Sequence, residues 1–492
     1  MKKLFLLALL AALFASCANE NDSPMDGYYK PEYDGLSNGE PANGENYEEY
    51  AENPFVFTSE EPTSTFSVDA DGGAYANTRR QLNQGHLPYP ASVRIEEYLN
   101  YFMFDYLTPT DGENIALNSE ISTCPWTEEN HIIRLGIKGR ELKESERTSS
   151  NYVMLVDVSG SMSGNMELLK TGFCRMVDAL SANDYVAIAT YSGSARAVMQ
   201  STQATEANKE IIKQTIRSLE SGGSTAGAAG IEVAYNLAKD NFIEGGNNRV
   251  VLISDGDFNV GRCTVEELEQ IITEKRSTGI YLTTIGMGYG NYNDAMMERL
   301  ANKGNGTYEY IDCAEEVERI FIENYDRFYA IANDTKIQIN FNPAMVERYR
   351  LIGYENRMMS NEDFERDSVD AGEIGASQTI TALYEVTLTD SAQLKNEEYL
   401  RFDVRYKIPG ETTARPVTHS LISPPSTIET ASANMRFAAS VAAFGLILRQ
   451  SQYRGNASYS MIYDLSEGVV SFDPYGRRNE FYQLVDKAES LE

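Results

Sequence analysis

The sequence predicts an α/β protein in which a doubly wound, mostly parallel sheet is inserted between strand-rich regions that form one β domain, with helices at the C-terminal end. Over residues 148–330, short apolar runs alternate with segments of helical periodicity, which is the pattern of a parallel sheet covered by helices. On either side, at 115–138 and 336–408, apolar residues recur with the period of strands. Neither side has enough strands for a stable β domain, so we expect the two to pair across the insertion.

Within the inserted unit, largely apolar segments of strand length are expected to be buried strands: Asn151–Val156, Tyr185–Tyr191, Arg249–Ser254 and Ile280–Gly286. The first expected helix has apolar residues at positions 169, 173, 176, 177 and 180, which places them on one face. This periodicity predicts helices at Glu167–Leu180, Lys209–Leu219, Ala228–Lys239, Thr264–Thr278 and Ala314–Phe328. The alternation of the two kinds of segment favours a doubly wound sheet.

The flanking regions contain both strands and helices. Before the insertion, residues 61–147 predict strands at Ile115–Thr123 and His131–Lys138, and helices at Ala74–Leu82 and Val93–Tyr101. After it, residues 331–492 predict strands at Lys336–Phe341, Val346–Tyr354, Thr379–Thr389 and Leu400–Ile408. The chain then ends with helices expected at Ala433–Gln450, Ser458–Leu465 and Glu480–Leu491, which we expect to pack on the β domain.

The first 17 residues have the composition of an export signal. Lys2 and Lys3 are followed by the apolar run 4–14, which is too short to span a bilayer, and then by small residues before Cys17. This ending resembles a bacterial lipobox, whose cysteine is acylated, although an ordinary signal peptide containing a cysteine remains the alternative. The resemblance implies a cell-envelope protein held by lipid at the outer membrane, with the periplasmic or surface side left open. No later apolar run of about 20 residues offers a second membrane attachment.

Residues 18–60 are expected to form a flexible acidic tether. They contain many Asp and Glu residues against a single lysine, Lys30, together with Gly, Pro and Asn. A segment with few aliphatic residues and a high charge density buries too little surface to offset the entropy lost on ordering.

The charge balance and the residue counts exclude several classes of function. With 42 basic and 73 acidic residues, the chain has a net charge of −31, which disfavours nucleic acid as a partner. The histidines are far apart and form no HExxH pattern, which argues against a zinc site: His86, His131 and His419. Five cysteines without CxxC spacing exclude a redox motif.

Three polar loops indicate a metal site. Asp157, Ser159 and Ser161 directly follow the expected strand that ends at Val156, and Ser254-Asp255-Gly256 follows another expected strand. The third loop, Gly222-Gly223-Ser224-Thr225, precedes a helix. Carboxylates and hydroxyls suit Mg²⁺, Mn²⁺ or Ca²⁺, and the carboxyl edge of an open α/β sheet is where ligands bind. The alternative is that these residues only cap helices and form turns.

The sequences DVSGSMS, GGSTAGAAG and ISDGDFNVG resemble the three loops of a von Willebrand factor A domain, whose sheet is doubly wound and Rossmann-like. In that family the loops build the metal-ion-dependent adhesion site. By position, the resemblance implies hydroxyl ligands from Ser159, Ser161 and Thr225, and carboxylates at Asp157 and Asp255 that bind the ion directly or through water. The nearby stretch GMGYG at 286–290 lacks the Lys of a phosphate loop and is expected to be a connection beside this edge.

The resemblance extends over residues 61–490. Phe66-Ser67-Val68-Asp69, Cys124-Pro125-Trp126 and Ala442–Leu448 are similar to the flanking regions of YfbK-type von Willebrand A lipoproteins. In this class of domain, a partner protein commonly supplies a carboxylate to the metal ion.

These observations predict a non-enzymatic binding module. Three neutral hydroxyl ligands leave the charge of a divalent ion incompletely neutralised, so an acidic residue of a protein partner can complete the coordination shell. The alternative is an envelope assembly or maturation factor that works with an ATPase or a secretion system. A metal-dependent hydrolase is disfavoured because none of the three loops has a His or Lys as general base. The identity of the ion and the ligand, the oligomeric state and the pairing of Cys124, Cys174, Cys263 and Cys313 stay open.

Overall fold

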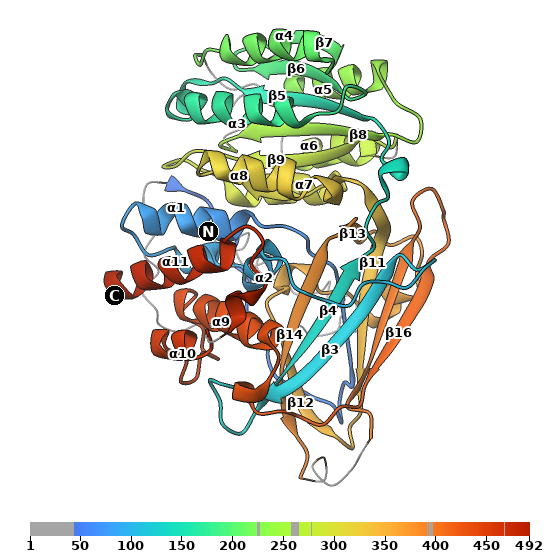
Figure 1. Ribbon diagram of the computed structural model, residues 1–492, viewed down its shortest axis with the longest axis vertical. Helices are drawn as coiled ribbons and strands as arrows, with labels where there is room; N and C mark the ends of the chain where they lie inside the picture. Colours follow the sequence, from blue (N-terminus) through green and yellow to red (C-terminus); the bar gives the residue numbers. More distant parts are fainter. Residues whose placement is uncertain are drawn as a thin grey trace, which may run out of the picture. The chain divides into compact units, whose positions relative to one another are not determined.

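The computed structural model describes residues 44–223, 227–256, 265–276, 278–390, 392, 397–466 and 468–492. Within these residues the chain forms a six-stranded sheet and two five-stranded sheets with helices around them (Figure 1). The six-stranded sheet comes entirely from the middle of the chain, whereas each five-stranded sheet combines strands from before and after it. The predicted insertion is therefore confirmed.

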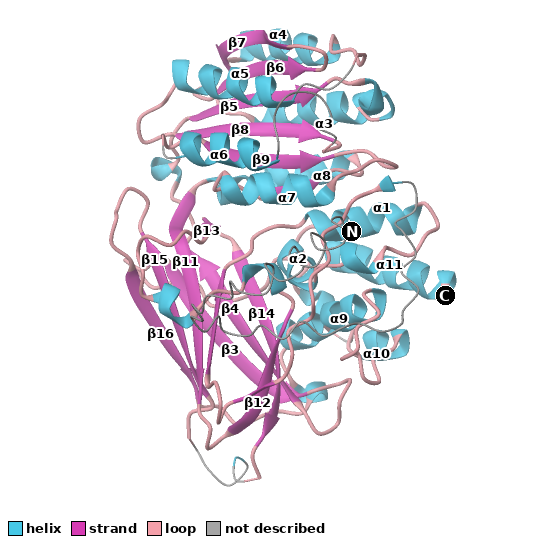
Figure 2. Cartoon of the chain, turned by 180° about the vertical axis from the view of Figure 1, so that it is seen from behind, coloured by secondary structure: helices cyan, strands magenta, loops and turns pink. Residues whose placement is uncertain are grey.

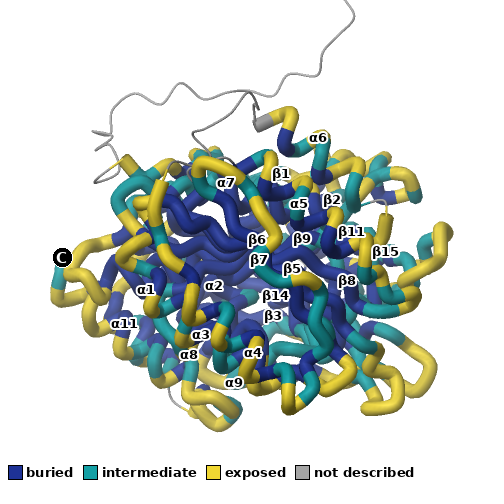
Figure 3. Tube along the Cα trace, turned by 90° about the horizontal axis from the view of Figure 1, so that it is seen from above, coloured by how far each residue is buried: buried dark blue, intermediate teal, exposed yellow. Residues whose placement is uncertain are grey.

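The six-stranded sheet has the order β10-β9-β8-β5-β6-β7 and is parallel except for β7, which runs antiparallel to β6. Its strands are β5 (Ser150–Asp157), β6 (Tyr185–Tyr191), β7 (Ala195–Gln203), β8 (Asn247–Ser254), β9 (Tyr281–Gly286) and β10 (Tyr308–Tyr310). All residues of β5 and β8 are buried, which explains why their sequences are almost continuously apolar. Figure 3 shows the buried strands inside a shell of more exposed helices and loops.

Helices cover both faces of this sheet, as a doubly wound fold requires. One apolar core lies under α3 (Met166–Ala179), α4 (Glu206–Arg217) and α8 (Ala314–Glu318). The other lies under α5 (Gly227–Asp240), α6 (Val265–Arg276) and α7 (Asp294–Lys303). Figures 1 and 2 show the sheet from its two sides.

One predicted helix of the inserted unit is interrupted. The segment Ala314–Phe328 begins as α8, continues as a π-helical turn at Arg319–Glu323 and ends in a 3₁₀ turn at Tyr325–Phe328. The strands β7 and β10 and the helix α7 were not predicted. The side chain of Asn293 begins α7 by accepting a hydrogen bond from the backbone N–H of Met296 at 3.2 Å.

The β domain is built from both flanks, as predicted. One sheet has the order β1-β12-β14-β4-β3, and the other has the order β13-β11-β15-β16 with β2 paired to β11. The strands before the insertion are β1 (Val56–Phe57), β2 (Thr63–Ser67), β3 (Ile115–Thr123) and β4 (His131–Gly139). Those after it are β11 (Ala330–Phe341), β12 (Val346–Ile352), β13 (Gly372–Gly375), β14 (Thr379–Leu388), β15 (Leu400–Lys407) and β16 (Arg415–Leu421). A single apolar core contains residues of both sheets.

A layer of helices packs against the β domain. It contains the C-terminal helices α9 (Ala433–Leu448), α10 (Tyr459–Asp464) and α11 (Arg477–Leu491) together with α1 (Gly73–Asn83) and α2 (Ile95–Tyr101). The helix α9 lies at the centre of this layer and is buried along nearly its whole length, with Gly445 allowing the close approach of Ile95. The predicted packing of the C-terminal helices is confirmed, and two N-terminal helices share the layer.

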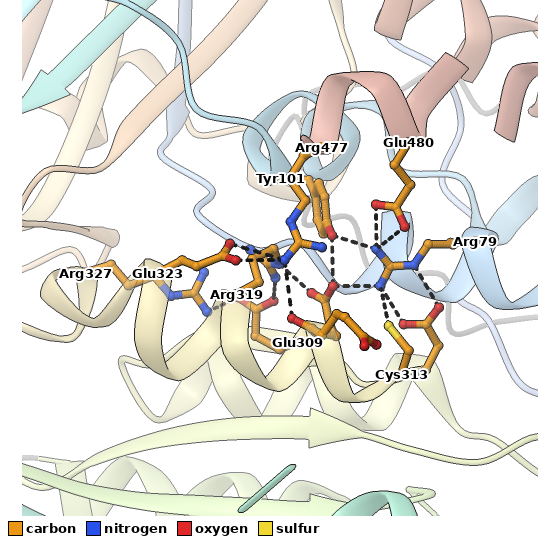
Figure 4. A network of polar contacts seen from close by, with 12 residues as sticks. Arg79, Tyr101, Glu309, Cys313, Arg319, Glu323, Arg327, Arg477 and Glu480 are labelled. Carbon is orange, nitrogen blue, oxygen red and sulfur yellow. Dashed lines mark hydrogen bonds and ion pairs between the residues drawn. The ribbon is translucent and has the colours of Figure 1, made fainter. Parts of the chain in front are cut away.

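Buried ion pairs join the inserted unit to the helical layer (Figure 4). Arg79 of α1 pairs with Asp312 at 2.5 Å and with Glu316 of α8 at 2.7 Å. Within the inserted unit, Arg319 pairs with the same Glu316 at 2.5 Å. The half-buried pair of Arg477 in α11 with Glu323, at 3.1 Å, adds a second link to the helical layer. Burial alone raises the pKa of Glu316, but the two arginines outweigh it and lower that pKa to about 2. The carboxylate is therefore strongly held in its charged form.

The predicted tether is wrong for residues 44–60. Tyr47 is 7% exposed, Glu45 pairs with Arg80 at 3.1 Å, and β1 pairs with β12. This segment is acidic, but one of its charges is neutralised by Arg80 and its aromatic residues bury apolar surface, which offsets the entropy of ordering. Residues 1–43, which include the signal and Cys17, lie outside the described residues. Among the described helices, none has the length and apolar character needed to cross a membrane.

Candidate metal centre

The topology of the six-stranded sheet places a ligand-binding edge at β5 and β8. The chain leaves β5 towards β6 on one side, and it leaves β8 towards β9 on the other. Ligands of open α/β sheets bind at such a switch point, outside the carboxyl ends of the strands. Because Val156 pairs with Ile253 in parallel register, Asp157 and Ser254 lie level with each other at this edge.

The side chain of Asp157 is held in place by burial and by hydrogen bonds to both carboxylate oxygens. It is fully buried, its Oδ1 accepts a hydrogen bond from the backbone N–H of Ser159 at 2.8 Å, and its Oδ2 accepts one from the Ser254 hydroxyl at 3.0 Å. Burial raises the pKa of Asp157 to about 6, and the charge of Asp255 raises it further, while the hydrogen bonds of Ser159 and Ser254 lower it. A nearby cation would favour the ionised form of this carboxyl group.

The two serines of the first loop converge beside Asp157. Their hydroxyl oxygens, Ser159 Oγ and Ser161 Oγ, are 3.0 Å apart. Ser159 is 2% exposed, whereas Ser161 lies in the 3₁₀ turn Gly160–Gly164 and is exposed. The site is thus closed towards the sheet and open towards solvent.

The second loop is fixed to the first by backbone hydrogen bonds. The N–H of Gly222 donates to the carbonyl of Val158 at 2.7 Å, and the N–H of Gly160 donates to the carbonyl of Gly223 at 3.3 Å. Gly223 has a φ of 92°, which favours glycine. The predicted ligand Thr225 lies outside the described residues, so its position in the site stays a prediction.

The third loop places Asp255 next to Asp157. Asp255 is 1% exposed, and its carboxylate accepts a hydrogen bond from Asn291 Nδ2 at 3.2 Å. At Gly256, where φ is 77°, a Cβ would come within 2.6 Å of the carbonyl oxygen of Asn293. The backbone N–H of Met287 donates to the carbonyl of Ser254 at 3.0 Å. The stretch 286–290 therefore lies beside this edge, as predicted.

The structure brings together Asp157, Ser159, Ser161 and Asp255, all of which the sequence predicts. Sequence reasoning did not assign roles to Ser254 and Asn291, which hold the two carboxylates. The described donors are all oxygen atoms of carboxylates and hydroxyls, which fits Mg²⁺, Mn²⁺ or Ca²⁺ and not zinc.

A second group of carboxylates lies elsewhere and forms ion pairs with two arginines. Asp69, Asp71 and Glu97 are buried, with oxygen atoms within 4.8 Å of one another. Arg357 pairs with Asp69 at 2.8 Å and with Asp71 at 2.9 Å, and Arg94 pairs with Glu97. These ion pairs give the cluster a structural role between the N-terminal region and the β domain.

The cysteines show no disulfide among the described residues. Cys124, Cys174 and Cys313 are free thiols. Cys263 lies outside the described residues, and its state stays open.

Comparisons with known proteins divide the chain into three matched regions. The model of the von Willebrand factor type A domain matches residues 151–321, the region that forms the six-stranded sheet and the candidate site. A model described as von Willebrand factor matches residues 41–134. A model described as the C-terminal region of the uncharacterized protein YfbK matches residues 326–491.

Relatives found by sequence agree with these matches. The chain is 38% identical to the uncharacterized protein YfbK of Escherichia coli (strain K12) over 472 residues, which cover 90% of this chain and 81% of that protein. It is 29% identical over 205 residues to the human voltage-dependent calcium channel subunit alpha-2/delta-2, covering 40% of this chain and 17% of that protein. Among solved structures, a von Willebrand factor type A protein from Catenulispora acidiphila is 14% identical, with a TM-score of 0.44 over 78% of this chain and 91% of that chain.

Proposed function

The chain belongs to the YfbK family of proteins with a von Willebrand factor type A domain, and on this premise we propose that it binds a partner protein through a divalent metal ion. Domains of this type mediate protein–protein interactions, often through such an ion. The observation that carries the proposal is the convergence of Asp157, Asp255, Ser159 and Ser161 at the solvent-facing end of β5 and β8. In this proposal a carboxylate of the partner completes the coordination of Mg²⁺, Mn²⁺ or Ca²⁺.

Electrostatics support an acidic partner in spite of the net charge of −31. The hydroxyls of Ser159 and Ser161 are neutral ligands, so a bound divalent ion keeps residual positive charge on its open side. Charges spread over the rest of the surface are screened over ~8 Å at physiological ionic strength, whereas the ion acts at contact distance.

The proposal is tested first by ion binding to the full chain. An ion that binds the folded state alone stabilises it by ~2.7 kcal/mol at about 100 times its dissociation constant. We expect Mg²⁺ or Mn²⁺ to raise the melting temperature of the wild type, and Asp157→Ala to lose this response more completely than Thr225→Ala. Asp240→Ala, an exposed position at the end of α5, is the matched control. If the ion raises the melting temperature of the wild type and of Asp157→Ala equally, these residues only cap helices and form turns.

Partner binding is tested by capture from intact cells. The wild type should retain a partner that EDTA releases, and Asp157→Ala should not retain it. The identity of the captured partner distinguishes a binding module from an envelope assembly or maturation factor, because an assembly factor should capture an ATPase or a secretion component. A partner that stays bound in EDTA contradicts the proposal.

We further propose that the protein is a cell-envelope lipoprotein, acylated at Cys17. The lipobox-like sequence before Cys17 supports this proposal. Cys17→Ala should move the protein from the membrane fraction to the soluble fraction and abolish palmitate labelling. Labelling that persists in the variant would exclude Cys17 as the acylated residue.

A further inference from the structure

A polar cavity of 690 Å³ lies between the six-stranded sheet and the β domain. Arg249 and Tyr281 reach it from the amino ends of β8 and β9, so it lies at the opposite end of these strands from the candidate metal centre. Arg327 and Glu373 also line it, the latter from β13. We call it the interdomain cavity. Its volume falls within the range of about 300–1,000 Å³ that small-molecule sites occupy.

Arg249 is a buried cation that forms no ion pair among the described residues. Its side chain is 5% exposed, Nη1 donates to the hydroxyl of Thr283 at 2.8 Å, and Nη2 donates to the carbonyl of Phe328 at 3.3 Å. Among the described residues, no carboxylate lies within ion-pair distance of it, and its buried Nε–H has no hydrogen-bond acceptor. Burial lowers the pKa of the Arg249 guanidinium, although the charge of Glu373 acts on it and raises that pKa. A buried charge without a counter-charge is costly unless a bound group neutralises it.

Arg327 adds a second cation to this side of the cavity. It pairs with Glu309, which also pairs with Arg319, and its Nε–H has no acceptor among the described residues (Figure 4). The positive charge of Arg327 further lowers the pKa of Arg249. Two guanidinium groups with open N–H donors form a site for a carboxylate.

Glu373 supplies an acidic group to the same cavity. Its Oε1 is buried and has no hydrogen-bond donor among the described residues. Burial, together with the charges of Asp370 and Asp334, raises the pKa of Glu373 to about 8. The neighbouring Asp370 is already paired with Arg276 at 2.5 Å, whereas Glu373 forms no ion pair among the described residues and can hold a cationic group.

Two further polar atoms in the lining have no partner among the described residues. They are Asn356 Oδ1 and Thr307 Oγ1. Buried polar atoms are nearly always hydrogen-bonded, so several open atoms around one cavity indicate that it holds polar molecules.

We propose that the interdomain cavity binds a small zwitterion, an α-amino acid or a short peptide, with its carboxylate at Arg249 and Arg327 and its ammonium group at Glu373. Acidic side chains outnumber basic ones in the lining, which disfavours a polyanion such as a phosphate ester. A purely cationic solute would compete with Arg249 for the charge of Glu373 and would offer the guanidinium no hydrogen-bond acceptor. A zwitterion offers a carboxylate to Arg249 and Arg327 and an ammonium group to Glu373.

The experiment uses calorimetry and thermal unfolding of the full chain with the standard amino acids and a set of dipeptides. Inorganic phosphate, Ca²⁺ and putrescine serve as probes for a plain anion, a metal ion and a plain cation. We expect a zwitterion to bind with one molecule per chain and to raise the melting temperature. If no zwitterion binds, the cavity holds water only and the proposal is overturned. Binding of phosphate or putrescine as tight as that of any zwitterion also overturns it.

Variants and modified ligands test the two ends separately. Arg249→Gln and Glu373→Gln should each weaken binding by at least about tenfold, a loss of ~1.4 kcal/mol. Arg217→Gln and Glu362→Gln, at exposed positions, are the matched controls and should bind as the wild type does. If Arg249→Gln fails to fold, the affinity of Glu373→Gln alone decides the test, because the glutamine amide has nearly the same shape as the glutamate carboxylate. A ligand whose amino group is N-acetylated has no ammonium group, so it should bind weakly to the wild type. The same ligand should bind Glu373→Gln as weakly as it binds the wild type. A further loss of affinity in this variant would contradict the assignment of the ammonium group to Glu373.

This inference is independent of the proposed function at the metal centre. Asp157→Ala and EDTA should leave zwitterion binding unchanged, because that site is at the other end of the strands. A loss of binding in both conditions would place the zwitterion at the metal centre and overturn its assignment to the cavity.

Discussion

Ser254 holds the Asp157 carboxylate through its hydroxyl at the point where the two central strands end. The same oxygen atom accepts a hydrogen bond from the backbone N–H of Gly256 at 3.0 Å, so one side chain fixes both a carboxylate and the loop that carries Asp255. Ser254→Ala leaves the buried Oδ2 of Asp157 without this donor. Leaving such an atom unsatisfied costs about 1–3 kcal/mol, so we expect a loss of that size in the free energy of unfolding and a weaker response to Mg²⁺.

Chemical denaturation with and without Mg²⁺ measures both effects. Ser218→Ala, which removes an exposed hydroxyl at the end of α4, is the control and should change neither. A Ser254→Ala variant with wild-type stability and an undiminished Mg²⁺ response would show that this hydroxyl does not organise the site.

Glu316 makes the stability of the protein sensitive to acid. Its pKa is about 2 in the folded state, against 4.5 for the ordinary group, so the folded state favours the ionised form. The resulting stabilisation is complete above about pH 4.5 and is lost as the pH falls towards 2. The difference of pKa corresponds to about 3 kcal/mol. Between pH 6 and pH 3, urea denaturation should show a steeper loss of stability for the wild type than for Glu316→Gln. Glu315→Gln, at the exposed neighbouring position, should follow the wild type.

The residues of the candidate metal centre were predictable to the extent that they adjoin strands. Asp157 ends β5, Ser159 and Ser161 follow it, and Asp255 follows β8. The apolar sequences of these strands mark their ends, and the carboxyl ends of neighbouring parallel strands meet at one edge. Asn291 contacts Asp255 from 36 positions away along the chain, and no local pattern indicates such a contact. Arg249 and Glu373 face one cavity only because two separate parts of the chain pack together.

Interior strands and edge strands differ in how clearly their sequences mark them. The strands β5 and β8 are buried on both faces and are therefore continuous apolar runs. β7 is an edge strand with mostly half-buried and exposed residues, and β10 has only three residues, so neither was predicted. The break after α8 also escaped prediction, because helical periodicity continues through the π-helical turn that follows.

The contact between α3 and α8 depends on the absence of a side chain at Gly172. A Cβ at this position would lie 2.3 Å from Cγ2 of Val317. Gly172→Ala gains about 1 kcal/mol of helix propensity, but overpacking costs about 1–3 kcal/mol, so we expect net destabilisation. The double variant Gly172→Ala/Val317→Ala should recover part of that loss relative to the sum of the single variants. Additive effects in this double-mutant cycle would contradict the proposed clash.

The β domain depends on strand pairings that join the two flanks across the insertion. That both flanks contribute to one β domain was predictable, because neither contains enough strands alone. The order of the strands was not, since several pairings satisfy the same alternation of apolar residues. Residues 44–60 were mistaken for part of a tether because their composition is acidic, while the arginine that neutralises Glu45 lies 35 positions away, in α1.

Cleavage of the chain before the insertion should leave the molecule intact. Residues 143–148 connect β4 to β5 and are exposed, so a site for a sequence-specific protease can be placed between Lys143 and Arg147. The N-terminal fragment keeps β4 paired with β14 from Thr379↔Lys138 to Val386↔His131, and β2 paired with β11. Arg79 in that fragment also remains in its buried ion pairs with Asp312 and Glu316. We therefore expect both fragments to elute together from a sizing column and to unfold in one transition, separating only in denaturant. Separate elution under native conditions would show that the N-terminal strands are not an integral part of the β domain.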